Sequence, residues 1–406
     1  MRTLSSLAVA TLLAGACLAS PPVVTSTHDP ALPVEILPAR ELWRLSDDDD
    51  EILGQIGDVT TDAEGNALLL DLSFNTVRIV DADGRSVGTV GREGDGPGEF
   101  RNPDQVLALP DGRIGVTQII PGKIITLHRD GTPGEPVAVP GGGSMVLLSD
   151  ATCAAGAIQI CANLLTRGDG GVGNLTRLQS VDLRGEPIAV LKESSQDTEE
   201  RGGAVAVRRG DADFDHHWAA DADGRVYVAP YDDEYLIEVL AADGAPERVI
   251  TVDYERQKRT REEIAAIEEE RDGIQAHGVQ VQLPPIDPYL RDVDQLYPRP
   301  DGTLWVVSSR ATRDRPDGTV GAFDVFDASG RFVRRVAIAA DFDPRYDEFV
   351  LEGDRLYVLK EALSAPASSP TSAGSGGMMV MRLGSSRAAG DDDRGPMPYE
   401  VVCYGI

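Results

Sequence analysis

Short apolar runs alternate with acidic turns along most of the chain. Gly65, Gly112, Gly224, Gly302 and Gly353 each close such a turn, and each is followed by a short, mostly apolar segment. Such segments are typical of β-strands joined by tight hairpins, because glycine adopts a positive φ easily and aspartate hydrogen-bonds within its own turn. A degenerate copy at residues 157–165 lies between the second and third of these glycines. The pattern therefore predicts six copies of one strand-and-turn unit.

In five copies a second strand follows the first and ends in a turn of its own. These second turns are Asp83-Gly84, Asp130-Gly131, Arg184-Gly185, Asp243-Gly244 and Ser329-Gly330. Repeats of short antiparallel strands are expected to form sheets stacked around a central axis. We therefore predict an all-β fold, a six-bladed β-propeller over residues 39–384. Because a ring has to close, a strand at residues 41–45 is expected to complete the last blade beside a strand at residues 378–383.

Two insertions and a tail interrupt this rhythm. Thr260 and Glu263 form a capping box, which predicts a helix that ends near Gly273 within an insertion at residues 260–290. That helix could pack on the rim of the ring, cover its axis or contact a partner. The segment 364–377 is rich in Ser, Pro, Ala and Gly and is predicted to be a flexible loop, and residues 385–406 a flexible acidic tail.

The N-terminus has the features of an export signal over residues 1–20. Arg2 precedes a short apolar core at residues 7–13, which small residues follow. Ala14-Gly15-Ala16-Cys17 resembles a bacterial lipobox, in which the cysteine is acylated. The alternative is ordinary cleavage after Ala19. The protein is therefore expected outside the cytoplasm, as an outer-membrane lipoprotein or as a periplasmic or secreted protein.

Charge and cysteine content limit the partners and the crosslinks. The chain has 38 Lys and Arg residues against 67 Asp and Glu residues, a formal net charge of −29. This balance argues against nucleic acid and against membrane contact other than through an N-terminal lipid anchor, and we expect a monomer. Outside the cytoplasm Cys153 and Cys161 could form a disulfide across a hairpin, with two free thiols as the alternative, while Cys403 is expected to stay unpaired in the tail.

One connection resembles a known group of proteins. Gly91-Arg92-Glu93-Gly94-Asp95-Gly96-Pro97-Gly98-Glu99-Phe100 is similar to the bridge between the first two blades of bacterial six-bladed β-propeller proteins related to NHL repeats. Residues 223–228 and 301–306 resemble blade-opening strands of that group, and residues 323–332 resemble its penultimate blade. The resemblance implies export and often a lipid anchor. It implies no single activity, because related propellers include binding modules, lactonases and an amidating lyase.

Residues that begin the innermost strands are the candidates for a site, because these strands surround the axis. The candidates are polar side chains at such positions: Asp104, Gln105, His217, Asp294, Gln295 and Asp347, with Asp58 and Glu348 beside them. No cofactor is predicted from these residues. Six-bladed lactonases hold a divalent cation near the axis, and Asp104, Gln105 and Asp294 could supply some of the six to eight oxygens that calcium takes. His216 and His217 are adjacent, so at most one of them is expected to face the axis.

No nucleophile motif is present, and no catalytic residue is assigned. The favoured function is therefore a binding or interaction module for a protein, peptide or glycan ligand. The alternative is a metal-dependent hydrolase of the lactonase or esterase type that uses the central channel.

Overall fold

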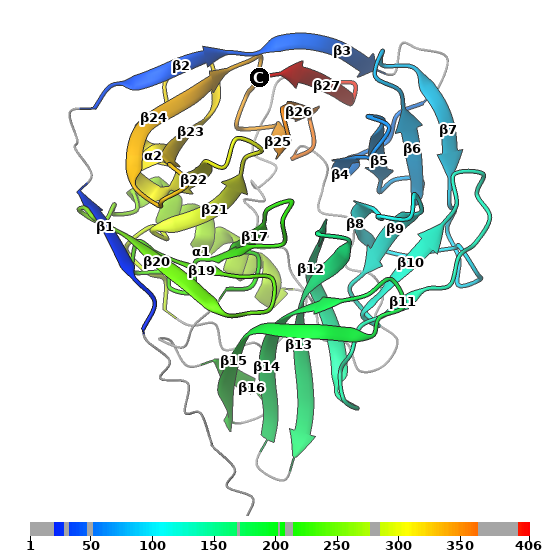
Figure 1. Ribbon diagram of the computed structural model, residues 1–406, viewed down its shortest axis with the longest axis horizontal. Helices are drawn as coiled ribbons and strands as arrows, with labels where there is room; N and C mark the ends of the chain where they lie inside the picture. The colour runs from blue at the N-terminus through cyan, green and yellow to red at the C-terminus, as the bar shows by residue number, and fades with distance from the viewer. Residues whose placement is uncertain are drawn as a thin grey trace, which may run out of the picture.

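The computed structural model describes residues 20–27, 32–46, 52–168, 171–201, 204–207, 214–276, 285–363 and 397–406. Six sheets of four or five strands are arranged around a central axis (Figure 1). Within the described residues only two segments are helical, α1 (Arg261–Ala276) and α2 (Ser309–Arg313). The predicted all-β, six-bladed β-propeller is confirmed.

Each blade is built from consecutive strands that pair in antiparallel fashion from the axis outward. Blade one contains β4 (Ile56–Thr61), β5 (Ala67–Asp71), β6 (Thr76–Val80) and β7 (Ser86–Val90). Blade two contains β8 (Pro103–Ala108), β9 (Ile114–Gln118), β10 (Lys123–Leu127) and β11 (Val137–Ala138). Blade three contains β12 (Met145–Ala154), β13 (Ala157–Gly168), β14 (Gly171–Val181), β15 (Pro187–Arg201) and β16 (Ala204–Val207). Blade four contains β17 (Trp218–Ala220), β18 (Val226–Val228), β19 (Leu236–Leu240) and β20 (Pro246–Asp253). Blade five contains β21 (Val293–Pro298), β22 (Leu304–Ser308), β23 (Thr319–Phe326) and β24 (Phe332–Ala339). Blade six contains β25 (Glu348–Glu352), β26 (Arg355–Lys360) and β27 (Glu400–Gly405).

The ring closes through an N-terminal strand, as predicted. β3 (Arg40–Ser46) pairs antiparallel with β27 and is the outermost strand of blade six. The expected neighbour at residues 378–383 lies outside the described residues, and the strand that fills this place is β27, close to the C-terminus. The prediction of a flexible tail is therefore wrong for residues 400–405. Cys403, expected in that tail, is fully buried in the blade.

Two further N-terminal strands extend the sheets of blades four and five. β1 (Val23–Thr27) pairs parallel with β20, and β2 (Val34–Pro38) pairs parallel with β24. Together with β3 they run along the outside of half of the ring (Figure 1). This arrangement was not predicted, because neither strand is followed by the acidic glycine turn that marks the other strands.

Packing between blades explains why the strand segments are apolar on both sides. All five residues of β5 are buried. Leu68 and Leu70 belong to a cluster with residues of blade two, and Ala67 and Leu69 to a cluster with residues of blade six such as Tyr357. A strand buried on both faces shows a continuous apolar run, as this one does, and no alternation. Most of the core consequently lies between neighbouring blades.

The two faces of the ring differ in their connections. Within each blade, the first and third turns lie on one face, which we call the short-turn face, and these are the glycine turns of the repeat. At Asp81 the carboxylate accepts from the backbone N–H of Asp83 (2.9 Å), and Gly84 has a φ of 84°. The opposite face carries the middle loop of each blade and every connection between blades, including α1 and α2. We call it the insertion face.

The helical insertion begins as predicted. Glu263 N–H donates to the Thr260 hydroxyl (3.2 Å), and Thr260 N–H donates to the Glu263 carboxylate (2.7 Å). The same carboxylate receives two hydrogen bonds, of 2.8 and 2.6 Å, from Arg313 at the end of α2. The start of the helix is thus attached to the loop of blade five, which favours packing on the rim. α1 extends beyond Gly273 to Ala276.

Candidate binding site around the propeller axis

Six carboxylates lie near the insertion face, one in each blade. Each stands in the innermost strand of its blade or just before it: Asp58, Asp104, Asp150, Asp215, Asp294 and Glu348. We call this set the axial acidic ring. The innermost strands β4, β8, β12, β17, β21 and β25 surround the axis in Figure 1. The set contains Asp104 and Asp294 of the predicted site and adds Asp150 and Asp215, which the sequence reading did not include.

Irregular pairing marks four of these six strands at the acidic residue. The register of the innermost strand shifts between Ile56 and Asp58, Pro103 and Val106, Leu148 and Asp150, and Val293 and Gln295. A β-bulge of this kind adds a residue to one strand and changes the direction in which the following side chains point. A sequence reading based on strict alternation cannot locate such bulges.

Gln105 joins blade two to blade three. Its side-chain N–H donates to the Asp150 carboxylate (2.7 Å), and its side-chain oxygen accepts from the backbone N–H of Ala151 (3.0 Å). Asp58 similarly accepts from the backbone N–H of Val106 across the junction of blades one and two (2.8 Å). These two predicted residues therefore brace neighbouring blades beside the axis.

Among the carboxyl groups of the axial acidic ring, Asp150 has the largest shift in pKa. Surrounding protein raises its pKa to about 6, while the hydrogen bond from Gln105 acts in the opposite direction. The neighbouring carboxylates of Asp215 and Asp104 raise this pKa further, and the His216 imidazole lowers it. Asp150 is thus close enough to Asp104 of blade two and Asp215 of blade four for their negative charges to repel its carboxylate.

A network of polar side chains continues from the axial acidic ring into blade three. The Asn163 side-chain N–H₂ donates to Asp215 (2.8 Å) and to the Ser149 hydroxyl (2.9 Å). Its side-chain oxygen accepts from the Thr176 hydroxyl (2.7 Å). The sequence signal for this network was the polar residue Asn163 within the largely apolar strand β13.

His217 and Asp294 meet at the junction of blades four and five. The Nδ1 atom of His217 lies 2.8 Å from the backbone carbonyl oxygen of Asp294. Burial and the positive charge of Arg291 lower the pKa of His217 to about 4, so the His217 imidazole is neutral at pH 7. A carbonyl oxygen can only accept, and Nδ1 therefore carries the proton and Nε2 is left as an acceptor. His216, by contrast, is exposed and has a φ of 62°.

The carboxylate of Asp294 is open to solvent although protein surrounds it on several sides. This surrounding protein raises its pKa, and the charges of Arg291 and Arg259 partly offset the effect. The adjacent Gln295 is also exposed, and its side-chain oxygen accepts a hydrogen bond from the Tyr297 hydroxyl. Blade five thus presents a carboxylate and an amide side by side on the insertion face.

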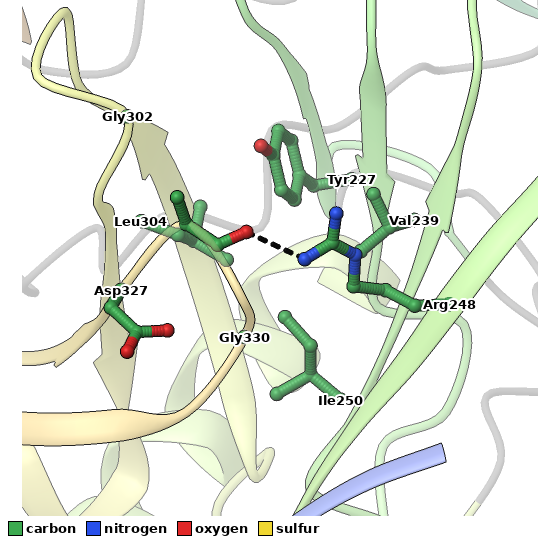
Figure 2. Close-up of a pocket in the computed structure, with 9 residues that line it drawn as sticks. Tyr227, Val239, Arg248, Ile250, Gly302, Leu304, Asp327 and Gly330 are labelled. Carbon is green, nitrogen blue, oxygen red and sulfur yellow. Dashed lines mark hydrogen bonds between the residues drawn. The ribbon is translucent and has the colours of Figure 1, made fainter. Parts of the chain in front are cut away.

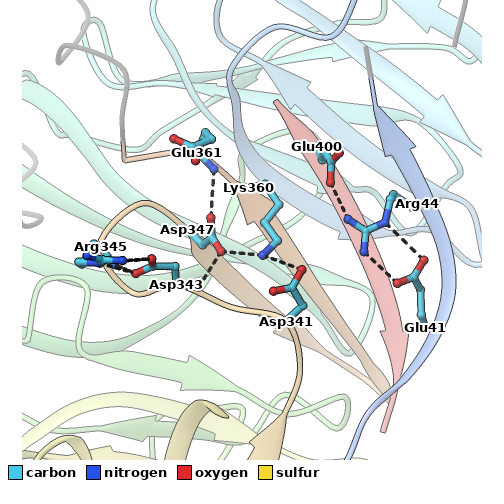
Figure 3. Close-up of polar contacts among 9 residues, drawn as sticks. All are labelled: Glu41, Arg44, Asp341, Asp343, Arg345, Asp347, Lys360, Glu361 and Glu400. Carbon is cyan, nitrogen blue, oxygen red and sulfur yellow. Dashed lines mark hydrogen bonds and ion pairs between the residues drawn. The ribbon is translucent and has the colours of Figure 1, made fainter. Parts of the chain in front are cut away.

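Asp347 has a different role from the one predicted. It is only 4% exposed, and its carboxylate accepts from Asp343 N–H (2.8 Å), Lys360 Nζ (2.9 Å) and Glu361 N–H (3.2 Å) (Figure 3). These bonds fix the loop that precedes β25. Its inclusion among the axis-facing candidates is therefore corrected: the carboxylate braces a loop and is not presented to a ligand.

Of the two alternatives for the cysteine pair, the structure favours two free thiols. Cys153 and Cys161 are free in the structure. They lie in paired strands, but Cys153 packs in the cluster between blades two and three, whereas Cys161 packs in the cluster between blades three and four. Side chains on opposite faces of one sheet point apart and cannot be bridged without moving the backbone.

The residues considered for calcium fall into two groups. Asp104 and Gln105 lie beside Asp150, whereas Asp294 lies beside His217. Across the described ranges, no three His, Cys, Asp or Glu side chains converge as metal ligands. A calcium ion near the axis stays a prediction.

A small cavity lies elsewhere, between blades four and five near the short-turn face (Figure 2). Tyr227, Ile250 and Leu304 line it, and Arg248 crosses it to donate to the Ala328 carbonyl oxygen (2.6 Å). Its volume of about 10 Å³ corresponds to roughly one water molecule. It therefore offers no room for an organic ligand.

No protein-family model and no curated protein sequence matches the chain. Among solved structures it is similar to a member of the DUF4221 family from Bacteroides vulgatus, with 11% identity, coverage of 90% of this chain and 97% of that chain, and a TM-score of 0.46. It is also similar to virginiamycin B lyase from Staphylococcus aureus (11% identity, 79% and 96% coverage, TM-score 0.39). A gluconolactonase from Xanthomonas campestris gives 15% identity, 82% and 95% coverage and a TM-score of 0.38.

In the part of the chain that the structure describes, no helix is long and apolar enough to cross a membrane.

Proposed function

We propose that this protein is an exported binding module that holds a protein, peptide or glycan ligand on its insertion face, around the axial acidic ring. The observation that carries the proposal is that each blade places one carboxylate in its innermost strand or just before it, on the face that also carries α1 and α2. Loops and strand ends on a rigid scaffold are the usual place for binding residues. The opposite face consists of tight turns whose polar groups are used within the turns.

The side chains around the axis suit hydrogen bonding to a neutral or cationic ligand. Asp294 and Gln295 are exposed, and neutral His217 leaves Nε2 as an acceptor. Arg291, the nearby cation, already donates to Asp232 and to the Ala229 carbonyl oxygen. Acceptors therefore outnumber available donors at blades four and five.

Binding can be tested on arrays of peptides and bacterial glycans, followed by calorimetric titration of the hits. We expect Asp294→Asn together with Gln295→Ala to weaken binding at least tenfold. Asp223→Asn is the matched control, because Asp223 lies in an exposed turn of the short-turn face. Equal losses in both variants, or ligand contacts that map to the short-turn face, would contradict the proposal.

A second function, hydrolysis, is favoured by one observation. The Asp150 carboxyl has a pKa of about 6 and lies near the exposed His216, and a group with such a pKa can act as a general acid near neutral pH. In the metal-dependent form of this alternative, the cation would be held beside Asp104 or beside Asp294. Elemental analysis of purified protein and of Asp104→Ala and Asp294→Ala, with lactone and ester substrates, tests it. A stoichiometric metal lost in one of these variants would favour the enzyme over the binding module.

Export and lipid anchoring are part of the proposal, together with a relation to NHL-repeat propellers. Cys17 lies outside the described residues, but the Pro22 carbonyl oxygen already accepts from Val249 N–H of β20 (3.0 Å). An acyl chain on Cys17 would therefore hold the outer edge of blade four close to the membrane. Cys17→Ser should abolish labelling with an alkyne fatty acid. Labelling that persists in this variant would refute acylation at Cys17.

A further inference from the structure

Exposed apolar side chains are distributed unevenly over the protein. Among the described residues, the large apolar side chains that are exposed lie either on one of the two outer strands of a sheet or on the insertion face. On the insertion face they are Ile52 (74% exposed), Phe74 (49%), Ile120 (44%), Met145 (49%) and Met397 (55%). In the described chain, none of the exposed large apolar side chains lies in a tight turn of the short-turn face.

Ile52 and Phe74 are presented by backbone segments that one carboxylate holds together. Asp71 accepts from Gly54 N–H (2.9 Å) and from Phe74 N–H (3.1 Å). The Ile52 carbonyl oxygen accepts from Arg78 (2.8 Å), and Leu72 N–H donates to the Gln55 carbonyl oxygen (2.8 Å). The two apolar side chains therefore stand on a braced part of blade one.

Ile120 and Met145 are presented in the same way at the junction of blades two and three. The loop that contains Ile120 bonds to the start of β12, because Leu148 N–H donates to the Ile119 carbonyl oxygen (3.1 Å). On the other side of Ile120, Gly122 N–H donates to the Val146 carbonyl oxygen (3.1 Å). Exposed apolar side chains on fixed backbone lose little conformational entropy when a ligand covers them.

The axial acidic ring and these apolar side chains stand at the insertion-face ends of the same blades: Asp58 shares blade one with Ile52 and Phe74, while Asp104 and Asp150 share blades two and three with Ile120 and Met145. The chain has a net charge of −29, so the face is expected to attract cations. A second copy of the chain would bring the same negative charge, and an anionic membrane would be repelled. A glycan would use the carboxylates but would leave Ile52 and Met145 without apolar partners.

We propose that the ligand of the insertion face is a basic peptide segment with large apolar side chains. Its Lys or Arg side chains would pair with the axial acidic ring, and its apolar side chains would cover Ile52 and Phe74 or Ile120 and Met145. This inference rests on the proposed binding function and specifies the class of ligand.

The test uses fluorescein-labelled peptides of one length in three versions: one with Lys and Leu/Phe residues, one with each Lys replaced by Glu, and one with each Leu and Phe replaced by Ser. Anisotropy titrations with the full-length protein are expected to show binding of the first version at least tenfold tighter than that of the other two. The affinity of the first version should fall as the salt concentration is raised, because part of its binding is ionic.

Two pairs of variants locate the contact. Phe74→Ser with Met145→Ser, and separately Asp104→Asn with Asp294→Asn, should each weaken binding at least tenfold. Val87→Ser and Asp223→Asn are the controls, because Val87 is exposed on the outermost strand of blade one and Asp223 on the short-turn face. Thermal unfolding of each variant checks that the fold is intact.

The outcomes separate this inference from the proposed function. If the Glu version binds as tightly as the Lys version, or if Phe74→Ser with Met145→Ser leaves the affinity unchanged, the inference is overturned. A glycan that binds at the insertion face, with no peptide binding, would overturn the inference and leave the proposed function standing. A basic peptide that contacts another surface would overturn both.

Discussion

Replacing Asp150 by Asn tests whether the carboxylates of blades two, three and four are crowded together. In the native protein this carboxyl has its pKa raised from 3.8 to about 6, by surrounding protein and by Asp215 and Asp104. Asn retains an oxygen that can accept the 2.7 Å hydrogen bond from Gln105, and its N–H₂ group can donate to a neighbouring carboxylate. The substitution therefore removes the charge and keeps the contact between the blades.

The sign of the effect follows from proton linkage. A carboxyl group whose pKa is raised by folding binds its proton more tightly in the native state, so its contribution to stability is present below about pH 4 and is lost as pH rises through 6. A displacement of about two pH units corresponds to about 3 kcal/mol. We expect Asp150→Asn and the parent to be about equally stable at pH 4, and the variant to be more stable at pH 8 by up to about 3 kcal/mol.

Urea unfolding followed by tryptophan fluorescence between pH 4 and pH 8 measures this difference. Asp182→Asn is the matched control in the same blade, because turn hydrogen bonds from Glu186 and Arg184 lower the pKa of Asp182. Because the pKa of Asp182 lies below 3.8 in the folded protein, the stability of the control relative to the parent should change little between pH 5 and pH 8. Parallel pH profiles of Asp150→Asn and the parent would refute the crowding of these carboxylates.

Three other predictions concern the fold. Removing residues 397–406 takes away β27, which pairs with both β26 and β3, so the truncated chain should fail to give a cooperative unfolding transition in scanning calorimetry. Cys153 and Cys161 should both react with a maleimide after unfolding without reductant; a mass that changes only after reduction would show a disulfide. Asp324→Ala should cost about 3 kcal/mol in urea unfolding, since it leaves Arg335 (2% exposed) without its buried partner and removes the acceptor of the Tyr235 and Ser308 hydroxyls. Asp324→Asn keeps an acceptor for these hydroxyls and should cost less; an equal loss in both variants would contradict that account.

The fold was predictable because its signal is local. Each turn of the short-turn face needs a glycine at positive φ and a carboxylate that bonds within the turn, as at Gly84 and Asp81, and both residue types are visible in the sequence. β27 was missed because it lies far along the chain from β26, its partner, and has no such turn beside it. β1 and β2 were missed for a similar reason, since parallel pairing on an outer strand leaves no turn signal.

The site was predictable only in part, because its geometry depends on strand irregularities and on contacts between blades. The rule that innermost strands begin near the axis found Asp104 and Asp294. It could not find Asp150, which lies several residues inside a longer strand and after a register shift. It also could not distinguish Asp347, whose carboxylate is used by its own loop, from an acidic residue that faces a ligand. For the same reason the proximity of Cys153 and Cys161 in sequence did not reveal that they occupy opposite faces of blade three.

The separation of the two faces explains why a sequence can specify this fold strongly and its function weakly. The turns that define the blades lie on the short-turn face, and the closing strands β3 and β27 are both in blade six, so neither element contributes to the axial acidic ring. The bulges of β4, β8, β12 and β21 and the helical insertion lie at the other ends of the strands. A change of residue on the insertion face, such as Asp294→Asn, therefore alters no turn signal and leaves the closing strands intact. It follows that substitutions of exposed residues near the axis, such as Asp294 and Gln295, should change ligand binding at little cost in folding stability. Substitutions of the turn glycines should instead destabilise the fold and leave the binding residues in place.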